Sequence, residues 1–137
     1  MVLISFNESE RIGECLRCVA WADEIIVVDS ESTDDTRAIA AKYTPLVHNI
    51  PWAGFGPQKN TAIDLATSDW ILSIDCDEYV SSQLADEIAS VIKMTDCHGF
   101  MIPFRNRFLG RSMRFGEWSG ERKLRLFRRG HGRFTDV

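Results

Sequence analysis

The chain has 137 residues, of which 45% are hydrophobic and 26% charged, and this composition fits one folded domain and excludes a disordered or collagen-like chain. Its 16 basic and 20 acidic residues give a formal net charge of −4, but the charges are separated along the chain. Residues 1–100 carry a net charge of −11 and residues 101–137 a net charge of +7. This asymmetry predicts that the C-terminal segment meets an anionic partner.

No membrane or secretion signal stands out in the sequence. No apolar run approaches the roughly 18 residues needed to cross a bilayer. The N-terminus also lacks a charged segment followed by a hydrophobic core. We therefore expect a cytoplasmic protein.

The cysteines allow two interpretations. Cys15 and Cys18 form a Cys-x-x-Cys pair, which is compatible with a redox centre or half of a zinc site. Cys15, however, shares an apolar stripe at helical spacing with Ile12 and Leu16, and no second pair with metal-ligand spacing follows. We interpret the cysteines as buried or incidental thiols.

Apolar strands alternate with amphipathic helices along most of the chain. Strands are expected at residues 2–6, 24–29, 46–50, 70–75 and 99–104. Helices are expected at residues 12–19, 32–43, 58–66 and 84–92, with capping by residues 7–10 and by Ser32. Residues 51–57 are rich in Pro and Gly and predict an irregular loop. The alternation predicts an α/β domain with a mainly parallel sheet, because parallel neighbours require crossover helices.

The last segment follows a different pattern. Residues 123–128 alternate basic and apolar side chains with a period of two. This pattern predicts an amphipathic strand with one solvated, positive face.

Carboxylates collect where the predicted strands end. Asp29 ends the second strand, and Asp75 and Asp77 end the fourth, two positions apart. Ligands bind beyond the carboxyl ends of the strands in open α/β sheets. Oxygen ligands of this kind suit Mg²⁺ or Mn²⁺, although Asp-x-Asp by itself also fits a solvated turn. Lys59, just past the Gly-Pro turn, offers positive potential to a diphosphate held by the same metal.

Four motifs in order along the chain resemble family 2 glycosyltransferases with the GT-A fold. They are Ile-Ser-Phe-Asn-Glu at 4–8, Ile-Ile-Val-Val-Asp-Ser-x-Ser-Thr-Asp-Asp-Thr at 25–36, Gln-Lys-Asn at 58–60 and Asp-Trp-Ile-Leu-Ser-Ile-Asp-Cys-Asp-Glu at 69–78. The segments at 20–24, 51–56, 106–110 and 123–128 are further similar to bacterial lipopolysaccharide core β-1,4-glucosyltransferases. The resemblance implies one glycosyltransferase domain over residues 1–137. Residues 1–100 would be its acidic nucleotide-sugar-binding half and residues 101–137 its basic acceptor-side segment.

The resemblance also implies a reaction and roles for individual residues. A hexose, expected to be glucose, would pass with inversion from a UDP-sugar to a lipopolysaccharide-core or related glycan acceptor, with Mg²⁺ or Mn²⁺ at the leaving diphosphate. Asp77 would coordinate the metal directly and Asp75 would face the ribose and the metal's water shell, as the two catalytic carboxylates. The residues implied to bind the nucleotide are Ser5, Phe6, Asn7, Asp29 (to the uracil), Lys59 and Asp75.

Two departures from the family pattern bear on activity. Glu31 occupies a position where relatives usually have Gly, and a side chain there is strained if the backbone needs a positive φ. Relatives continue beyond residues 132–134 into a segment expected to carry the general base, whereas Asp136 is the only nearby carboxylate here. We therefore expect a C-terminally incomplete domain with weak or no catalysis that still binds nucleotide.

The basic segment, residues 101–137, indicates what kind of partner the protein binds. Its density of Arg and Lys favours an anionic glycan acceptor and peripheral contact with the inner membrane. Interleaved aromatic residues would also suit single-stranded nucleic acid, but the acidic remainder would repel a polyanion, so no nucleic-acid partner is expected. A non-catalytic nucleotide- or anion-binding fragment remains an alternative. So does a nucleotidyltransferase, although residues 7–10 are not the Gly-rich basic loop expected of that class. The oligomeric state is left open.

Overall fold

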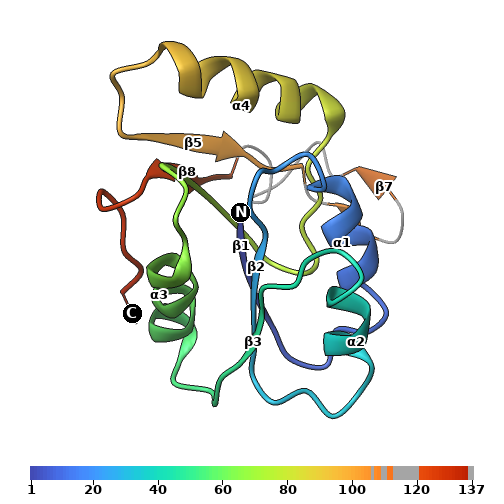
Figure 1. Cartoon of the computed structure of the whole chain (residues 1–137). Helices are drawn as coiled ribbons and strands as arrows, with labels where there is room; N and C mark the ends of the chain where they lie inside the picture. The colour runs from blue at the N-terminus through green and yellow to red at the C-terminus, as the bar shows by residue number, and fades with distance from the viewer. Residues whose placement is uncertain (106, 109–110, 113–120, 136–137) are drawn as a thin grey trace.

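The computed structural model describes residues 1–105, 107–108, 111–112 and 121–135. Strands and helices alternate as far as residue 103, as the sequence predicts, and only strands follow (Figure 1). In chain order the elements are β1 (Val2–Ser5), α1 (Ile12–Cys18), β2 (Ile26–Asp29), α2 (Thr36–Ala40), β3 (Val47–Asn49), α3 (Phe55–Leu65), β4 (Trp70–Ile74), α4 (Ser82–Met94), β5 (Gly99–Pro103), β6 (Arg107–Phe108), β7 (Arg111–Ser112) and β8 (Arg122–Arg128).

Six of the strands form one sheet in the order β3-β2-β1-β4-β8-β5. The pairs β3-β2, β2-β1 and β1-β4 are parallel, whereas β8 runs antiparallel to both β4 and β5. The chain moves outward from β1 to β3 and then returns to place β4 on the other side of β1. The strand order therefore reverses between β1 and β4, and this is where open α/β sheets bind their ligands.

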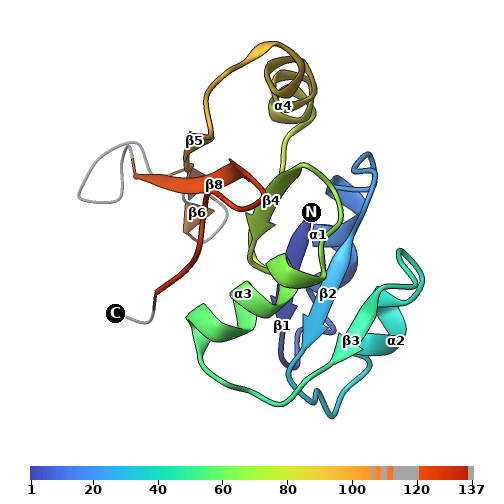
Figure 2. The same cartoon turned by 60° about the vertical axis from the view of Figure 1, so that its left-hand side comes forward.

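The two faces of the sheet are covered by different helices (Figures 1 and 2). Alternate residues of each strand point to opposite faces, so neighbouring residues such as Val2 and Leu3 belong to different cores. Leu3 belongs to the same apolar cluster as Leu16 of α1 and Ile88 of α4, whereas Val2 belongs to the cluster that contains Ile63 of α3. Two apolar layers thus hold β1, β2 and β4, most of whose residues are buried on both faces, whereas the edge strand β3 is half-buried to exposed.

The helix starts differ from the sequence prediction. α3 begins at Phe55 rather than at residue 58, because Pro57 lies in its first turn, where a missing N–H loses no helical hydrogen bond. The predicted cap by Ser32 is wrong, since α2 begins after Asp35 without a side-chain cap and the Ser32 hydroxyl accepts from the Asn7 amide instead. The cap predicted for α1 is also wrong, because Arg11 precedes that helix without a side-chain bond.

Two further predictions concern Cys15 and membrane-spanning helices. Cys15 of α1 is fully buried in the core, as its apolar stripe predicts. Among the described residues, no helix is both long enough and apolar enough to span a membrane.

Candidate functional site

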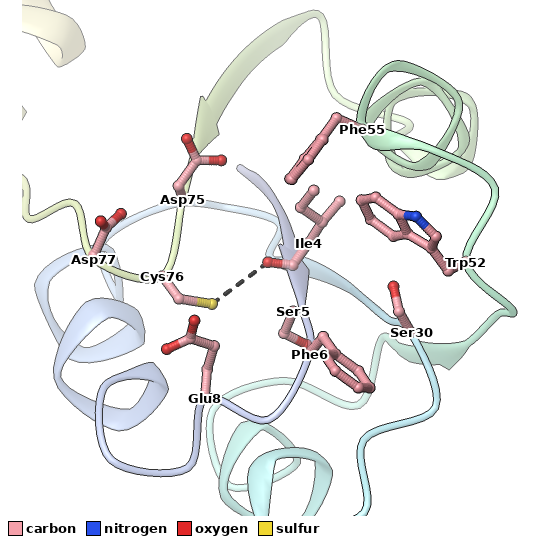
Figure 3. A pocket seen from close by; sticks show the side chains of 10 residues that line it. All are labelled: Ile4, Ser5, Phe6, Glu8, Ser30, Trp52, Phe55, Asp75, Cys76 and Asp77. Atoms are coloured by element: carbon pink, nitrogen blue, oxygen red, sulfur yellow. Dashed lines mark hydrogen bonds between the residues drawn. The ribbon is translucent and has the colours of Figure 1, made fainter. Parts of the chain in front are cut away.

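A hollow of about 510 Å³ lies beyond the carboxyl ends of β1, β2 and β4, where the strand order reverses (Figure 3). This is the place that the sequence predicts for a ligand. The residues that line the hollow are Ile4, Ser5, Phe6, Glu8, Ser30, Trp52, Phe55, Asp75, Cys76 and Asp77.

One wall of the hollow is aromatic. Phe6, Trp52 and Phe55 expose 57%, 49% and 72% of their surface, although large aromatic side chains usually bury most of theirs. The rings of Trp52 and Phe55 meet edge to face, with 4.8 Å between their centroids. Figure 3 shows these side chains on one side of the hollow and the carboxylates of Asp75 and Asp77 on the other. The hollow is therefore two-sided, with a surface for a flat ring opposite a surface for cations.

A hydrogen-bond donor is fixed near the aromatic wall. The buried Gln58 amide donates one proton to the Ser30 Oγ (3.1 Å) and the other to the Ile50 carbonyl (3.0 Å). Because the Ser30 hydroxyl accepts from Gln58, its own proton remains available to a ligand in the hollow. Gln58 Oε1 is buried and accepts no hydrogen bond within the described residues.

Asp29 lies beneath the hollow rather than in its wall. Its carboxylate is 0% exposed and accepts hydrogen bonds from the Ser5 Oγ (2.8 Å) and from the Ser32 amide (2.8 Å) and hydroxyl (2.5 Å). Arg37 adds an ion pair at 3.5 Å. In this arrangement Asp29 holds the ends of β1 and β2 together. A direct contact with uracil stays a prediction, and it would require Ser5 or Ser32 to give up its bond.

Two residues beside the hollow have left-handed backbone conformations. Asn7 has a φ of 52° and Glu31 a φ of 61°. The Asn7 side chain accepts a hydrogen bond from the Thr33 amide (2.9 Å), and the Asn7 amide donates to Ser32 Oγ (2.8 Å). Asn7 therefore ties the β1 end to the loop after β2 and is not among the lining residues. The positive φ of Glu31 confirms the strain expected at that position.

The carboxylate side of the hollow contains two ion-paired acids and two cations. Asp75 Oδ1 lies 2.6 Å from Lys59 Nζ, and Asp75 Oδ2 lies 2.7 Å from an Arg125 Nη2. Burial alone would raise the pKa of Asp75, but the hydrogen bond and charge of Lys59, joined by the charge of Arg125, outweigh it and lower the pKa. Asp75 therefore remains ionised, with both oxygens already engaged.

Glu78 completes this group. Its Oε1 bonds to the same Arg125 nitrogen, and its Oε2 accepts a hydrogen bond from the Asp75 amide (3.0 Å). Burial raises the pKa of Glu78, with Asp75 adding to the rise and Arg125 opposing it. Arg125 itself is only 5% exposed. The prediction of a solvated positive face on residues 123–128 is therefore wrong at Arg125, whereas Leu124, expected on the apolar face, is exposed.

A β-bulge explains this reversal of faces. Phe100 of β5 pairs with Leu126 of β8, and Met101 pairs with Leu124, so Arg125 has no partner on β5. A bulged residue breaks the alternation of faces and re-aims side chains locally. The prediction from alternating side chains assumes a strand without a bulge. No feature of the sequence marks Arg125 as the bulged residue.

Asp77 is the carboxylate of residues 75–78 that is available to a metal ion. Its side chain is exposed and has no hydrogen bond or ion pair with any other described residue. Within the described part of the chain, no three His, Cys, Asp or Glu side chains are grouped so that they could hold a metal by themselves. A single free carboxylate nevertheless fits Mg²⁺ or Mn²⁺, because these ions are commonly held by one or two carboxylates together with substrate phosphates and water.

The predicted site residues are only partly brought together. Ser5, Phe6, Asp75 and Asp77 line the hollow, and Lys59 contacts it through Asp75. Asn7 and Asp29 support it from behind, and Asp136 lies outside the described residues. Sequence reasoning placed Glu8, Ser30 and Glu78 at the strand ends without giving them a role, and it missed Ile4, Cys76 and Arg125. For Trp52 and Phe55, the only sequence feature that could indicate a place in the site was the presence of aromatic residues in the loop before Lys59.

Comparison with known proteins agrees with this geometry. The model of the family "Glycosyl transferase family 2" matches residues 1–134. The chain is 30% identical over 138 residues to the lipopolysaccharide core biosynthesis glycosyltransferase LpsC of Rhizobium meliloti, covering 96% of this chain and 51% of LpsC. It spans at most about half the length of the curated relatives it matches.

Two solved structures are similar in fold. The structure of residues 1–349 of S. aureus TarS in complex with UDP-GlcNAc has a TM-score of 0.59 and 28% identity, over 67% of this chain and 30% of that one. The mannosyltransferase PcManGT of Pyrobaculum calidifontis, in complex with GDP-Man and Mn²⁺, has a TM-score of 0.58 and 25% identity, over 72% of this chain and 32% of that one. These similarities confirm the predicted GT-A fold with its mainly parallel sheet.

Proposed function

Since the chain belongs to glycosyl transferase family 2, we propose that it binds a UDP-hexose together with a divalent cation, as the donor-binding part of an enzyme that transfers the hexose, with inversion, to a glycan acceptor of the lipopolysaccharide-core type. The observation that carries the proposal is the two-sided hollow. A nucleoside diphosphate sugar has a flat base at one end and a metal-binding diphosphate at the other. The aromatic wall and the carboxylate wall match these two ends.

The aromatic wall would receive the base. Stacking of a base on an aromatic side chain contributes roughly 1–3 kcal/mol. Phe6, Trp52 and Phe55 offer such surfaces, and the free proton of Ser30 offers a donor to a base or ribose oxygen nearby.

The carboxylate wall would receive the diphosphate. Asp77 would hold Mg²⁺ or Mn²⁺, which also accepts phosphate oxygens as ligands. When bound, the cation would neutralise charge on the leaving diphosphate. Lys59, ion-paired with Asp75 at the same end of the hollow, offsets the charge of that carboxylate and so reduces its repulsion of a diphosphate. Glucose as the sugar is supported by the sequence resemblance.

The acceptor is proposed from charge and from the relatives. Residues 101–137 carry a net charge of +7, which favours an anionic glycan such as a phosphorylated lipopolysaccharide core. LpsC is named for lipopolysaccharide core biosynthesis. The same charge would support peripheral association with the cytoplasmic face of the inner membrane.

Calorimetry tests the donor site. Titration with UDP, UDP-glucose and UDP-galactose, with and without Mn²⁺, should show UDP binding that depends on the metal. Asp77→Asn should abolish the metal-dependent component, whereas Asp86→Asn, an exposed carboxylate on α4 outside the hollow, should leave it unchanged. Trp52→Ala should weaken UDP binding by roughly 5- to 150-fold, corresponding to the loss of one stacking contact. Equal affinities with and without Mn²⁺ in both the parent and Asp77→Asn would contradict the proposal.

A further inference from the structure

We infer that Arg125 is a positioning residue for the metal-binding turn, fixing residues 75–78 so that the Asp77 carboxylate is presented to the hollow. The inference rests on the proposed function for its consequence, since it assigns Asp77 to the metal. Its structural part, the fixing of the turn, stands on the contacts below and can be tested without any ligand.

Arg125 closes a ring of bonds around the turn. Its Nη2 binds both Asp75 Oδ2 (2.7 Å) and Glu78 Oε1, and Glu78 Oε2 accepts from the Asp75 amide (3.0 Å). The Glu78 amide in turn donates to the Asp75 carbonyl (3.0 Å). The first and last residues of the turn are therefore held by side chain and backbone together. Asp77 lies between them and has no bond of its own with any other described residue.

The charges in this group also balance. Two carboxylates, Asp75 and Glu78, face two cations, Lys59 and Arg125. The formal charges of these four side chains therefore sum to zero. Without Arg125, two adjacent carboxylates would share Lys59 alone and would repel each other. Because the group is neutral, Asp77 is left as the turn's uncompensated carboxylate. Its charge is therefore free to attract a divalent cation.

The position of Arg125 is set by the bulge in β8. The extra residue lies between the pairs formed with Phe100 and Met101, and its side chain is directed into the interior beside the end of β4. A buried arginine costs free energy unless its donors are paired, and Arg125 Nε has no partner among the described residues. A leucine would fill the interior without this cost. The bulge and the buried charge are explained if the arginine acts on the turn.

The test uses Arg125→Met, Glu78→Gln and the double variant, with Arg17→Met as a control for loss of an exposed arginine. Hydrogen exchange is measured on the free protein, Mn²⁺ affinity in the presence of UDP by electron paramagnetic resonance, and Tm by calorimetry. In Arg125→Met we expect the amides of residues 75–78 to exchange at least tenfold faster, while those of Ile71 and Leu72 are unchanged. Mn²⁺ affinity should fall at least tenfold, and metal-free UDP affinity should stay within twofold.

The double variant separates positioning from stability. Glu78→Gln removes the charge repulsion that Arg125→Met creates, so the double variant should regain part of the lost Tm without regaining Mn²⁺ affinity. Recovery of Mn²⁺ affinity in step with Tm would show a merely structural role and overturn the inference. Unchanged exchange at residues 75–78 in Arg125→Met would overturn it even if the parent bound no UDP. Absence of UDP and Mn²⁺ binding in the parent, with faster exchange in the variant, would instead refute the proposed function alone.

Discussion

Glu31 should be replaceable by glycine with a gain in stability. Its φ of 61° lies in the left-handed region, which costs an L-residue roughly 1–2 kcal/mol. Glycine avoids this cost but makes the unfolded chain more flexible, which offsets about 0.4–1 kcal/mol. The net gain for Glu31→Gly is therefore about 0.5–1 kcal/mol. For 137 residues the entropy of unfolding is about 0.29 kcal/mol/K, so Tm should rise by about 2–3 °C.

Two further variants identify the cause of the gain. Glu31→Ala removes the same negative charge but keeps the unfavourable conformation, so its Tm should not rise. Glu31→Asn should fall between Ala and Gly, because asparagine tolerates the left-handed region, as it does at Asn7. Thermal unfolding by circular dichroism measures all three. An equal rise in Glu31→Ala and Glu31→Gly would show that charge, and not backbone strain, is the origin, and no rise in Glu31→Gly would refute the reasoning.

Two other predictions concern titratable groups. Burial raises the pKa of the Cys15 and Cys76 thiols, whereas Cys97 is exposed. Iodoacetamide at pH 8 should therefore label Cys97 first, as measured by peptide mass spectrometry. Early labelling of Cys76 would contradict this prediction. Hydrogen bonds led by the Thr36 hydroxyl lower the pKa of Asp34 to about 2, so its contribution to stability is complete above pH 4 and is lost as the pH falls toward 2. Asp34→Asn should flatten that acid dependence in denaturant titrations, and an unchanged slope would refute the assignment.

The sheet could be predicted because its signals are local. The continuous apolar runs of β2 and β4 are the pattern of strands covered on both faces, and the structure covers them with α1 and α3. The helix caps could not be predicted in the same way. Ser32 has the right residue type for a cap, but its hydroxyl donates to the buried Asp29 and accepts from the Asn7 amide instead of from a helix amide. A tertiary contact thus overrides the local preference.

In the candidate site, too, the residues marked by local sequence could be predicted and those placed by tertiary contacts could not. Asp75 and Asp77 could be found from the sequence, since they follow a buried strand directly. Trp52 could be seen only as an aromatic residue in a loop, because nothing in the sequence says whether such a ring packs on the domain or faces a ligand. Arg125 was assigned to the wrong face, since its burial depends on a bulge that no residue type announces. The position of a side chain cannot be predicted from local sequence when it depends on pairing between strands that are far apart in the chain.

The placement of β8 has a consequence for how the protein folds. The last strand of the sheet inserts between β4 and β5, and it brings Arg125 to Asp75 across 50 positions of chain. Such non-local pairing slows folding, because the loop must close before its contacts are made. Until β8 arrives, β4 and β5 both present unpaired edges, which can pair with another chain. The strand that carries Arg125 to Asp75 is thus also the one that covers the edges of β4 and β5.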